Sequence, residues 1–208
     1  MFVRDYMSVD PITISPDESV GDALEKLKEH AIRRLPVLSK GKIVGLVTNQ
    51  DLLKASPSPA TSLSIHEINY LFPKIKIRDV MTRDVITINP DAAIEEAAVT
   101  MRENKIGTLV VEKNGKLVGL ITESDIFKAF IDILGFDCPG VRVAVAVDDQ
   151  TGELGKITSL IGSLNINIYS LVIGHTRDGR VVITMRLKTD QSLELTTELE
   201  KKGYEIIS

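Results

Sequence analysis

Hydrophobic and polar positions along the first part of the chain follow one pattern that occurs twice. Each copy starts with a short apolar run typical of a β-strand, Ile12 to Ile14 in the first and Ile86 to Ile88 in the second. Next comes a stretch whose apolar residues recur three and four positions apart, which predicts an amphipathic helix. Two β-rich runs and a second helix follow, so the predicted order is β-α-β-β-α, twice. The apolar positions of the first helix are Val20, Ala23, Leu24 and Leu27 in one copy and Ile94, Ala97, Ala98 and Met101 in the other.

The two copies align without a gap. Residues 3–55 lie over residues 77–129 at a constant offset of 74, with 23 identities in 53 positions. The pairs Lys40-Gly41 and Asn114-Gly115 separate the two β-rich runs and predict tight hairpin turns. One copy buries little surface alone, but two can pack into one core. We therefore expect a pseudo-two-fold pair with two related clefts.

The motif G-φ-φ-T-x-x-D, in which φ is apolar, closes each copy where a strand ends and a helix begins. Its threonine and aspartate are Thr48 and Asp51 in the first copy and Thr122 and Asp125 in the second. Such a pair can form a capping box, which stabilises a helix start by about 1 kcal/mol. It can also bind a nucleotide, since a helix start attracts an anion and a carboxylate can accept both ribose hydroxyls. The residues alone leave both interpretations open.

After Gly135 and Pro139-Gly140 the pattern changes. Strands and helices now follow the order βαββαβ, which is the ferredoxin-like plan. The first of these helices has an apolar face that would cover one side of the sheet. That face consists of Leu154, Ile157, Leu160, Ile161 and Leu164. The predicted fold class is α+β.

Composition narrows the classes of function. The chain has 208 residues, 43% of them apolar and 26% charged, with a formal net charge of −4 and no basic half. A protein that binds nucleic acid through its phosphates usually has a basic face, so we expect no nucleic-acid partner. Cys138 is the single cysteine, and the three histidines are scattered, which favours a reducing compartment and no metal site. No apolar run approaches a membrane span or a signal peptide, so we expect a cytoplasmic protein.

The repeat resembles the cystathionine-β-synthase-type (CBS) domain. The similarity lies in the P-x-x-s-φ-x-x-A helix, the L-P-V strand, the G-K-φ-V-G-φ-φ hairpin and the final T-x-x-D. It implies that an adenosine ligand, such as AMP, ADP, ATP or S-adenosylmethionine, binds in the clefts as a regulatory ligand, with no cofactor required. By this resemblance the ribose candidates are Thr48, Asp51, Thr122 and Asp125.

Four neighbouring positions match those that line adenine pockets in the family. They are Ser15 and Asn89 after the first strand of each copy, and Ile32 and Ile106 before the second. Each also has an ordinary structural interpretation. The two polar residues suit local caps, and the two isoleucines suit the core.

Arg33 and Arg34 stand where members of the family place phosphate-binding basic side chains. The second copy has Gly107 and Thr108 at these positions. The resemblance therefore implies two unequal clefts, with a phosphorylated ligand in the one near the arginines. Solvated surface arginines are the alternative.

The C-terminal part resembles the ACT domain, through the segment D-x-x-G-x-L-x-x-I-x-x-x-I and the I-N-I that follows. This implies an amino-acid or other small-metabolite effector at a dimer interface, with Asp149, Gly152 and Asn167 at the ligand positions. Thr151 replaces the usual proline and Asn165 the usual glycine. Asn tolerates a left-handed turn, so the turn is retained. A ligand-free ACT domain used for dimerisation is the alternative.

Residues 56–76 begin as a Ser/Pro linker and continue as a helix-like HEINYLF. His66 and Glu67 lack a third ligand nearby, which favours solvated polar groups over a metal site. CBS pair, HEINYLF and ACT domain in this order resemble the acetoin-utilisation AcuB family, which implies a link to acetoin catabolism. The expected divisions are CBS repeat 1 at 1–56, a linker at 57–76, CBS repeat 2 at 77–133, a linker at 134–140 and the ACT domain at 141–208.

These features predict a regulatory ligand-sensing protein rather than an enzyme. The sequence has no visible nucleophile, base and orienting group, and no phosphate loop of the form G-x-x-x-x-G-K-[ST]. We expect a homodimer with a regulated protein partner. The alternative is an interaction or dimerisation module that senses nothing and acts as a subunit of an enzyme or a transcription regulator.

Overall fold

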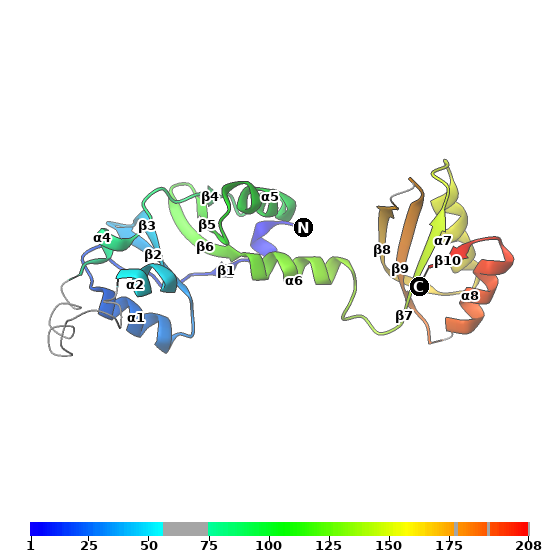
Figure 1. Ribbon diagram of the computed structural model, residues 1–208, viewed down its shortest axis with the longest axis horizontal. Coiled ribbons are helices and arrows are strands. Elements are labelled where there is room, and N and C mark those ends of the chain that lie inside the picture. Colours follow the sequence, from blue (N-terminus) through cyan, green and yellow to red (C-terminus); the bar gives the residue numbers. More distant parts are fainter. Residues whose placement is uncertain (56–74, 177–178, 191, 208) are drawn as a thin grey trace. The chain divides into compact units, whose positions relative to one another are not determined.

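The structure, a computed structural model, describes residues 1–55, 75–176, 179–190 and 192–207. It divides into two compact units, Met1–Ile126 and Phe127–Ser208, and we describe each by itself (Figure 1). The division falls inside helix α6 (Glu123–Ile133), so the expected linker at 134–140 belongs to the second unit. The HEINYLF segment, with His66 and Glu67, lies outside the described residues.

In the N-terminal unit both copies form the predicted helices and hairpins. The elements of the first copy are α1 (Val20–Glu29), β2 (Arg34–Ser39), β3 (Lys42–Thr48) and α2 (Asn49–Ala55). Those of the second copy are β4 (Thr87–Ile88), α5 (Ile94–Asn104), β5 (Thr108–Lys113), β6 (Lys116–Thr122) and α6. The predicted strand at Ile12 to Ile14 is reduced to a single parallel bridge between Ile14 and Val37 of β2.

The hairpins turn as the sequence predicts. Lys40 and Gly41 have φ values of +49° and +77°, and Asn114 and Gly115 have +54° and +75°. Positive φ at both central residues matches the right-handed twist of the paired strands. These turns set the register that places Arg34 opposite Thr48, at the end of the hairpin next to the second helix.

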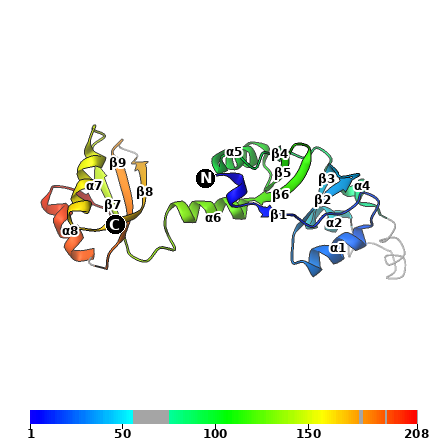
Figure 2. The same ribbon diagram turned by 180° about the vertical axis from the view of Figure 1, so that it is seen from behind.

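The first residues of each copy pack on the other copy. The N–H of Val3 donates to the carbonyl of Ala92 at 2.9 Å, and the N–H of Ile77 donates to that of Glu18 at 3.0 Å. The two bonds are equivalent, because Val3 corresponds to Ile77 and Glu18 to Ala92 at the offset of 74 between the copies. Figures 1 and 2 show the N-terminal end beside α5 of the second copy. The short helices of the two segments are η1 (Val3–Asp5) and α4 (Ile77–Val80).

The first residues of each copy, which pack on the other copy, are thus exchanged between the copies, and this exchange also includes strand pairing. β1 (Ser8–Val9) pairs antiparallel with β6, which gives the second copy a four-stranded sheet of order β1-β6-β5-β4. In the first copy Thr82 makes the equivalent bridge to Leu46 of β3. As a result, the residues after Val9 lie near the second copy and those after Thr82 near the first.

The apolar positions predicted for α1 and α5 supply the core of this unit. Val20, Ala23 and Leu27 are buried in α1, and their counterparts in α5 are buried as well. They pack on the apolar residues of the hairpins. In the first copy that cluster also contains Ile14, Leu35, Val37, Val47, Leu52 and Ile77.

The C-terminal unit has the predicted βαββαβ order. Its elements are β7 (Val141–Val147), α7 (Glu153–Ser163), β8 (Asn167–His175), β9 (Val181–Lys188), α8 (Ser192–Lys201) and β10 (Glu205–Ile206). The strands form one antiparallel sheet of order β10-β7-β9-β8, and both helices lie on one face of it (Figure 1). Ile157 and Ile161 of α7 and Leu199 of α8 are fully buried against the sheet. Asn165 adopts the expected left-handed turn with φ +57°.

Within the described ranges, no helix combines the length and the apolar character that crossing a membrane requires.

Candidate ligand clefts

The larger of two clefts in the N-terminal unit, cleft 1, has a volume of about 680 Å³ and is lined by both copies. The first copy contributes Thr48 and Asp51 at the start of α2. The second copy contributes Ile86 and Ile106, together with the polar residues that precede Ile86. This volume lies within the usual range for small-molecule sites, roughly 300 to 1,000 Å³.

The smaller one, cleft 2, has a volume of about 370 Å³ and is the pseudo-symmetric counterpart. Ile12 and Ile32 of the first copy line it, with Thr122 and Ser124 of the second. Asp125 is not among its lining residues, although it is bonded to Thr122. In both clefts the threonine of one copy faces residues of the other copy, because the entering segments are exchanged.

The T-x-x-D motif of the first copy forms a complete capping box, in which the N–H of Asp51 donates back to Oγ1 of Thr48 at 3.3 Å, and in both copies the threonine donates to the aspartate. In the first copy the N–H and the hydroxyl of Thr48 donate to Oδ2 of Asp51 at 2.9 and 2.7 Å. In the second copy Thr122 donates to Oδ2 of Asp125 at 2.8 and 2.7 Å. Oδ1 of each carboxylate has no hydrogen-bond partner among the described residues. Capping and ligand binding are therefore compatible, because the cap occupies one oxygen and leaves the other.

Arg33 and Arg34 line both clefts. The sequence predicts that they favour one cleft, but the structure puts them between the two. Arg34 is half-buried, and burial, reinforced by the adjacent positive charge of Arg33, lowers the pKa of its guanidinium. The carboxylates of Glu123 and Asp125 oppose that shift in pKa.

Gly107 makes room for this arrangement. A Cβ at this position would lie 2.9 Å from Oε2 of Glu123 and 3.4 Å from Nη2 of Arg34. Thr108, which takes the place of Arg34 in the second copy, is 7% exposed and lines cleft 1. Its Oγ1 is buried and has no hydrogen-bond partner among the described residues. The substitution of two arginines by Gly and Thr thus changes both the charge and the space between the copies.

Two of the predicted adenine-pocket residues line clefts and two do not. Ile106 lines cleft 1 and Ile32 lines cleft 2. Ser15 lies outside both linings and accepts a bond from the N–H of Asp17 at 3.3 Å. Asn89 likewise accepts a bond from the N–H of Asp91 at 2.8 Å. Both polar residues therefore act as local turn caps in this structure.

Sequence reasoning missed the residues that the exchange brings into the clefts. These are Asp84, Val85, Ile86 and Lys105 in cleft 1 and Asp10, Pro11 and Ile12 in cleft 2. Asp10 and Asp84 recur at the repeat offset, as do Ile12 and Ile86. That recurrence was a usable signal, but the pattern alone does not say which copy they face.

The C-terminal unit separates the residues that the ACT resemblance indicates. Asp149 and Gly152 follow the end of β7, whereas Asn167 begins β8 and pairs with Lys188 at the end of β9. β7 is antiparallel to β9, so the two positions lie at opposite ends of the sheet, about 20 Å apart at 3.3 Å per residue. One chain therefore does not bring all three together.

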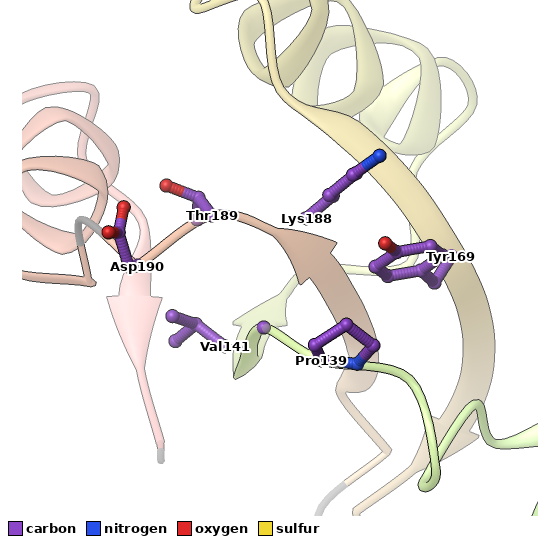
Figure 3. A pocket seen from close by; sticks show the side chains of 7 residues that line it. Pro139, Val141, Tyr169, Lys188, Thr189 and Asp190 are labelled. Atoms are coloured by element: carbon purple, nitrogen blue, oxygen red, sulfur yellow. The ribbon is translucent and has the colours of Figure 1, made fainter.

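A hollow of about 450 Å³ opens in this unit where β7 begins and β9 ends. Figure 3 shows Pro139 and Val141 on one side of it, with Tyr169 and Lys188 across from them. Apolar surface dominates its lining, apart from Lys188, Thr189 and Asp190. Neither Asp149 nor the other residues of the ACT resemblance line it. Within the part of the chain described, no group of three or more His, Cys, Asp or Glu side chains is placed to hold a metal ion.

Comparison with protein families finds the CBS domain at residues 3–58 and 77–132, together more than half of the chain. Among curated proteins, an inosine-5′-monophosphate dehydrogenase of Korarchaeum cryptofilum is 36% identical over 119 residues, which are 57% of this chain and 22% of that enzyme. An uncharacterized protein of Methanocaldococcus jannaschii is 35% identical over 157 residues, covering 63% of this chain and 92% of its own length. The shared region is thus a small part of the dehydrogenase, and this chain does not span most of that enzyme.

Solved structures give the same match. A candidate acetoin utilization protein (AcuB) from Vibrio cholerae superposes with a TM-score of 0.54 at 30% identity, covering 66% of this chain and 95% of that one. The CBS domain pair of protein MJ0100, in complex with 5′-methylthioadenosine and S-adenosyl-L-methionine, gives 0.52 at 30% identity and covers 62% and 95%. CBSX2 in complex with AMP gives 0.52 at 29% identity and covers 64% and 97%.

Proposed function

We propose that this chain, which belongs to the CBS-domain family, is a regulatory protein that binds adenosine ligands in the two clefts of its repeat pair. The observation that carries the proposal is cleft 1, where the capping pair Thr48 and Asp51 of one copy faces Ile86 and Ile106 of the other. A nucleoside needs an apolar surface for its base and an acceptor for its ribose hydroxyls. Cleft 1 offers both across a single opening.

The chemistry of the lining assigns a part of the ligand to each group. Ile86 and Ile106 give the flat base an apolar contact on the side of the second copy. Oδ1 of Asp51, which the cap leaves free, accepts from the ribose hydroxyls. Arg33 and Arg34 supply charged donors for a phosphate, which bind an oxyanion more strongly than neutral donors do.

The related structures support this class of ligand. The CBS pair of MJ0100 was solved with 5′-methylthioadenosine and S-adenosyl-L-methionine, and CBSX2 with AMP. All three ligands contain adenosine and differ in what the 5′ position bears. The ribose and the base are therefore the parts that a common site would recognise, and the arginines would select among the 5′ groups.

The finer parts of the proposal concern the C-terminal unit. We propose that it is an ACT-type domain which binds an amino acid or related metabolite in a homodimer, in a protein linked to acetoin catabolism. Its βαββαβ order and sheet order support the domain type. Because Asp149 and Asn167 lie at opposite ends of the sheet, a site that uses both needs a second chain.

Helix α6 supports the homodimer and also the alternative of an interaction module. Phe127 and Phe130 are 67% and 58% exposed, and Ile131 and Ile133 add to the same apolar stretch. Contiguous exposed apolar surface usually marks an interaction site. Replacing both phenylalanines with serine should lower the mass measured by light scattering from dimer to monomer. A dimer that persists in this variant would contradict this assignment of the interface.

A thermal-shift panel of AMP, ADP, ATP, S-adenosylmethionine and adenosine tests the main proposal. A ligand at 100 times its dissociation constant adds about 2.7 kcal/mol of stability, which raises the melting temperature by several degrees. Asp51→Asn should weaken binding at cleft 1 by about tenfold or more, because a charged acceptor of ribose hydroxyls is lost. If no adenosine compound raises the melting temperature, the proposal is wrong.

A matched control separates the loss of the cap from the loss of the ligand. Ser19 and Asp22 form an equivalent capping box at the start of α1, with bonds of 2.8 and 2.7 Å to Oδ2. Asp22 lies outside the linings of both clefts. Asp22→Asn should therefore lower the stability by about as much as Asp51→Asn does and leave the affinity for the adenosine ligand unchanged. If Asp22→Asn weakens binding as much as Asp51→Asn, the carboxylate of Asp51 acts only through folding.

A further inference from the structure

The two clefts share one pair of cationic side chains. Arg33 and Arg34 line both cleft 1 and cleft 2, since they lie on the first copy where it meets the second. Strict pseudo-symmetry would provide a second pair at Gly107 and Thr108, but neither residue carries a charge. The protein thus has two clefts and one arginine pair.

Arg34 lies between the copies and is half-buried. Its guanidinium lies beside Gly107, where an added Cβ would be 3.4 Å from Nη2. The carboxylates of Glu123 and Asp125, in the second copy, favour its charged form. Because Arg34 lines both clefts, a guanidinium N–H that it donates to a phosphate in one cleft is not available to a phosphate in the other.

The remaining charges differ between the clefts. Lys105 also lines cleft 1, so a phosphate there has a second source of positive charge. Among the described residues that line cleft 2, the arginines are the only cations, while Asp10 of cleft 2 has its counterpart in Asp84 of cleft 1. A phosphate in cleft 2 therefore depends on the arginines more strongly than one in cleft 1.

We infer that the shared arginines make a phosphate bound in one cleft weaken phosphate binding in the other, so that the protein favours one phosphorylated and one phosphate-free adenosine ligand together. This inference rests on the proposed function. The first phosphorylated ligand recruits Arg34 to cleft 1, and a second phosphate in cleft 2 then has fewer charged donors. A ligand without phosphate, such as adenosine or 5′-methylthioadenosine, makes no demand on the arginines and still enters cleft 2.

Calorimetric titration of the full chain tests this sharing with two probes, AMP and adenosine. The ratio of the second dissociation constant to the first should be about tenfold larger for AMP than for adenosine. The second AMP lacks one or two of the charged hydrogen bonds that the first one makes. Adenosine added to protein already holding one AMP should bind with the affinity of its own cleft 2 site. Equal ratios for AMP and adenosine would overturn the inference.

Variants of Arg34 identify the shared group. In Arg34→Gln the ratio of the two AMP constants should fall to the ratio that the same variant gives for adenosine. Arg34→Lys, which retains the charge, should restore most of the gap. A thermal unfolding midpoint close to that of the unaltered chain shows that each variant is folded. If the AMP ratio is unaffected in Arg34→Gln, the inference is wrong.

The same titrations separate the two proposals. Absence of binding by both AMP and adenosine contradicts the adenosine-sensing function itself. Two adenosine sites together with two AMP sites of matching ratio contradict only the sharing of Arg34.

Discussion

A methyl group added at Gly119 tests whether the exchanged N-terminal segment stabilises the second copy. A Cβ at this position would lie 2.8 Å from the carbonyl oxygen of Ser8 and 2.8 Å from Sδ of Met7. The methionine side chain can rotate away, but the oxygen of Ser8 is backbone that pairs with β6. Gly119→Ala therefore has to displace β1 from the sheet.

The expected cost follows from the kind of contact. Overpacking of this kind typically costs about 1–3 kcal/mol, and a backbone neighbour places Gly119→Ala in the upper part of that range. Gly45, the equivalent glycine of the first copy, has Thr82 O at 3.0 Å from its Cβ position and should behave similarly. Because Ser8 and Val9 line cleft 2, Gly119→Ala should also weaken ligand binding there more than in cleft 1.

Urea unfolding followed by far-ultraviolet circular dichroism measures this cost as a drop in the midpoint. Gly162→Ala is the control, since an added Cβ at this second-last residue of α7 meets nothing within 4 Å. That control should stabilise its helix by at most about 1 kcal/mol, the propensity difference between Gly and Ala in a helix interior. If Gly119→Ala unfolds at the midpoint of the unaltered chain, β1 contributes nothing to the N-terminal unit and the reasoning from the close approach is refuted.

Two further predictions concern single turns. The N–H of Ser19 lowers the pKa of Asp22 below its ordinary 3.8, so the stability from this capping box is complete above that value and is lost as the pH falls through the lower folded pKa. The unfolding midpoint measured as a function of pH should fall below about pH 4, and Asp22→Asn should remove the part of this fall that is due to Asp22. An identical acid profile for Asp22→Asn would contradict the assignment. Asn165 has φ +57°, so replacement by Gly should be tolerated, whereas replacement by Ala should lower the stability by about 1 kcal/mol. Thermal unfolding measures both effects. Equal effects of the two replacements would show that the turn is not strained.

Local patterns in the sequence were sufficient for most of the elements. The helix periodicity around Val20, the Lys40-Gly41 turn and the βαββαβ order of the C-terminal unit all correspond to what the structure contains. These features depend on contacts within a few residues, such as a cap, a turn or one apolar face. The threonine and aspartate pairs were likewise identified, with both interpretations of them, because a T-x-x-D spacing is itself a local geometry.

Pairing between the two copies was decided only by the tertiary structure. A repeat at a fixed offset allows Ile12 to serve its own copy or the other one, since both present the same surface. The long-range pairing of Ser8 with Leu120 brings Ile12 beside the second copy in cleft 2, whereas Ile14 bridges Val37 of its own copy. Ser15 is a local cap outside the clefts, where the family resemblance had implied an adenine contact.

The order of two CBS copies before a βαββαβ unit could be predicted from the residues alone, as could the lack of a counterpart to Arg33 and Arg34 in the second copy. The residues alone did not determine which cleft the arginines serve. That follows from the meeting of the two copies, where the lack of a Cβ at Gly107 leaves room for Glu123 and Arg34, and Arg34 lines both clefts. The sequence sets how many charged residues the chain has. Whether one charged residue lines two clefts depends on the folded backbone, because folding decides which residues lie next to each other.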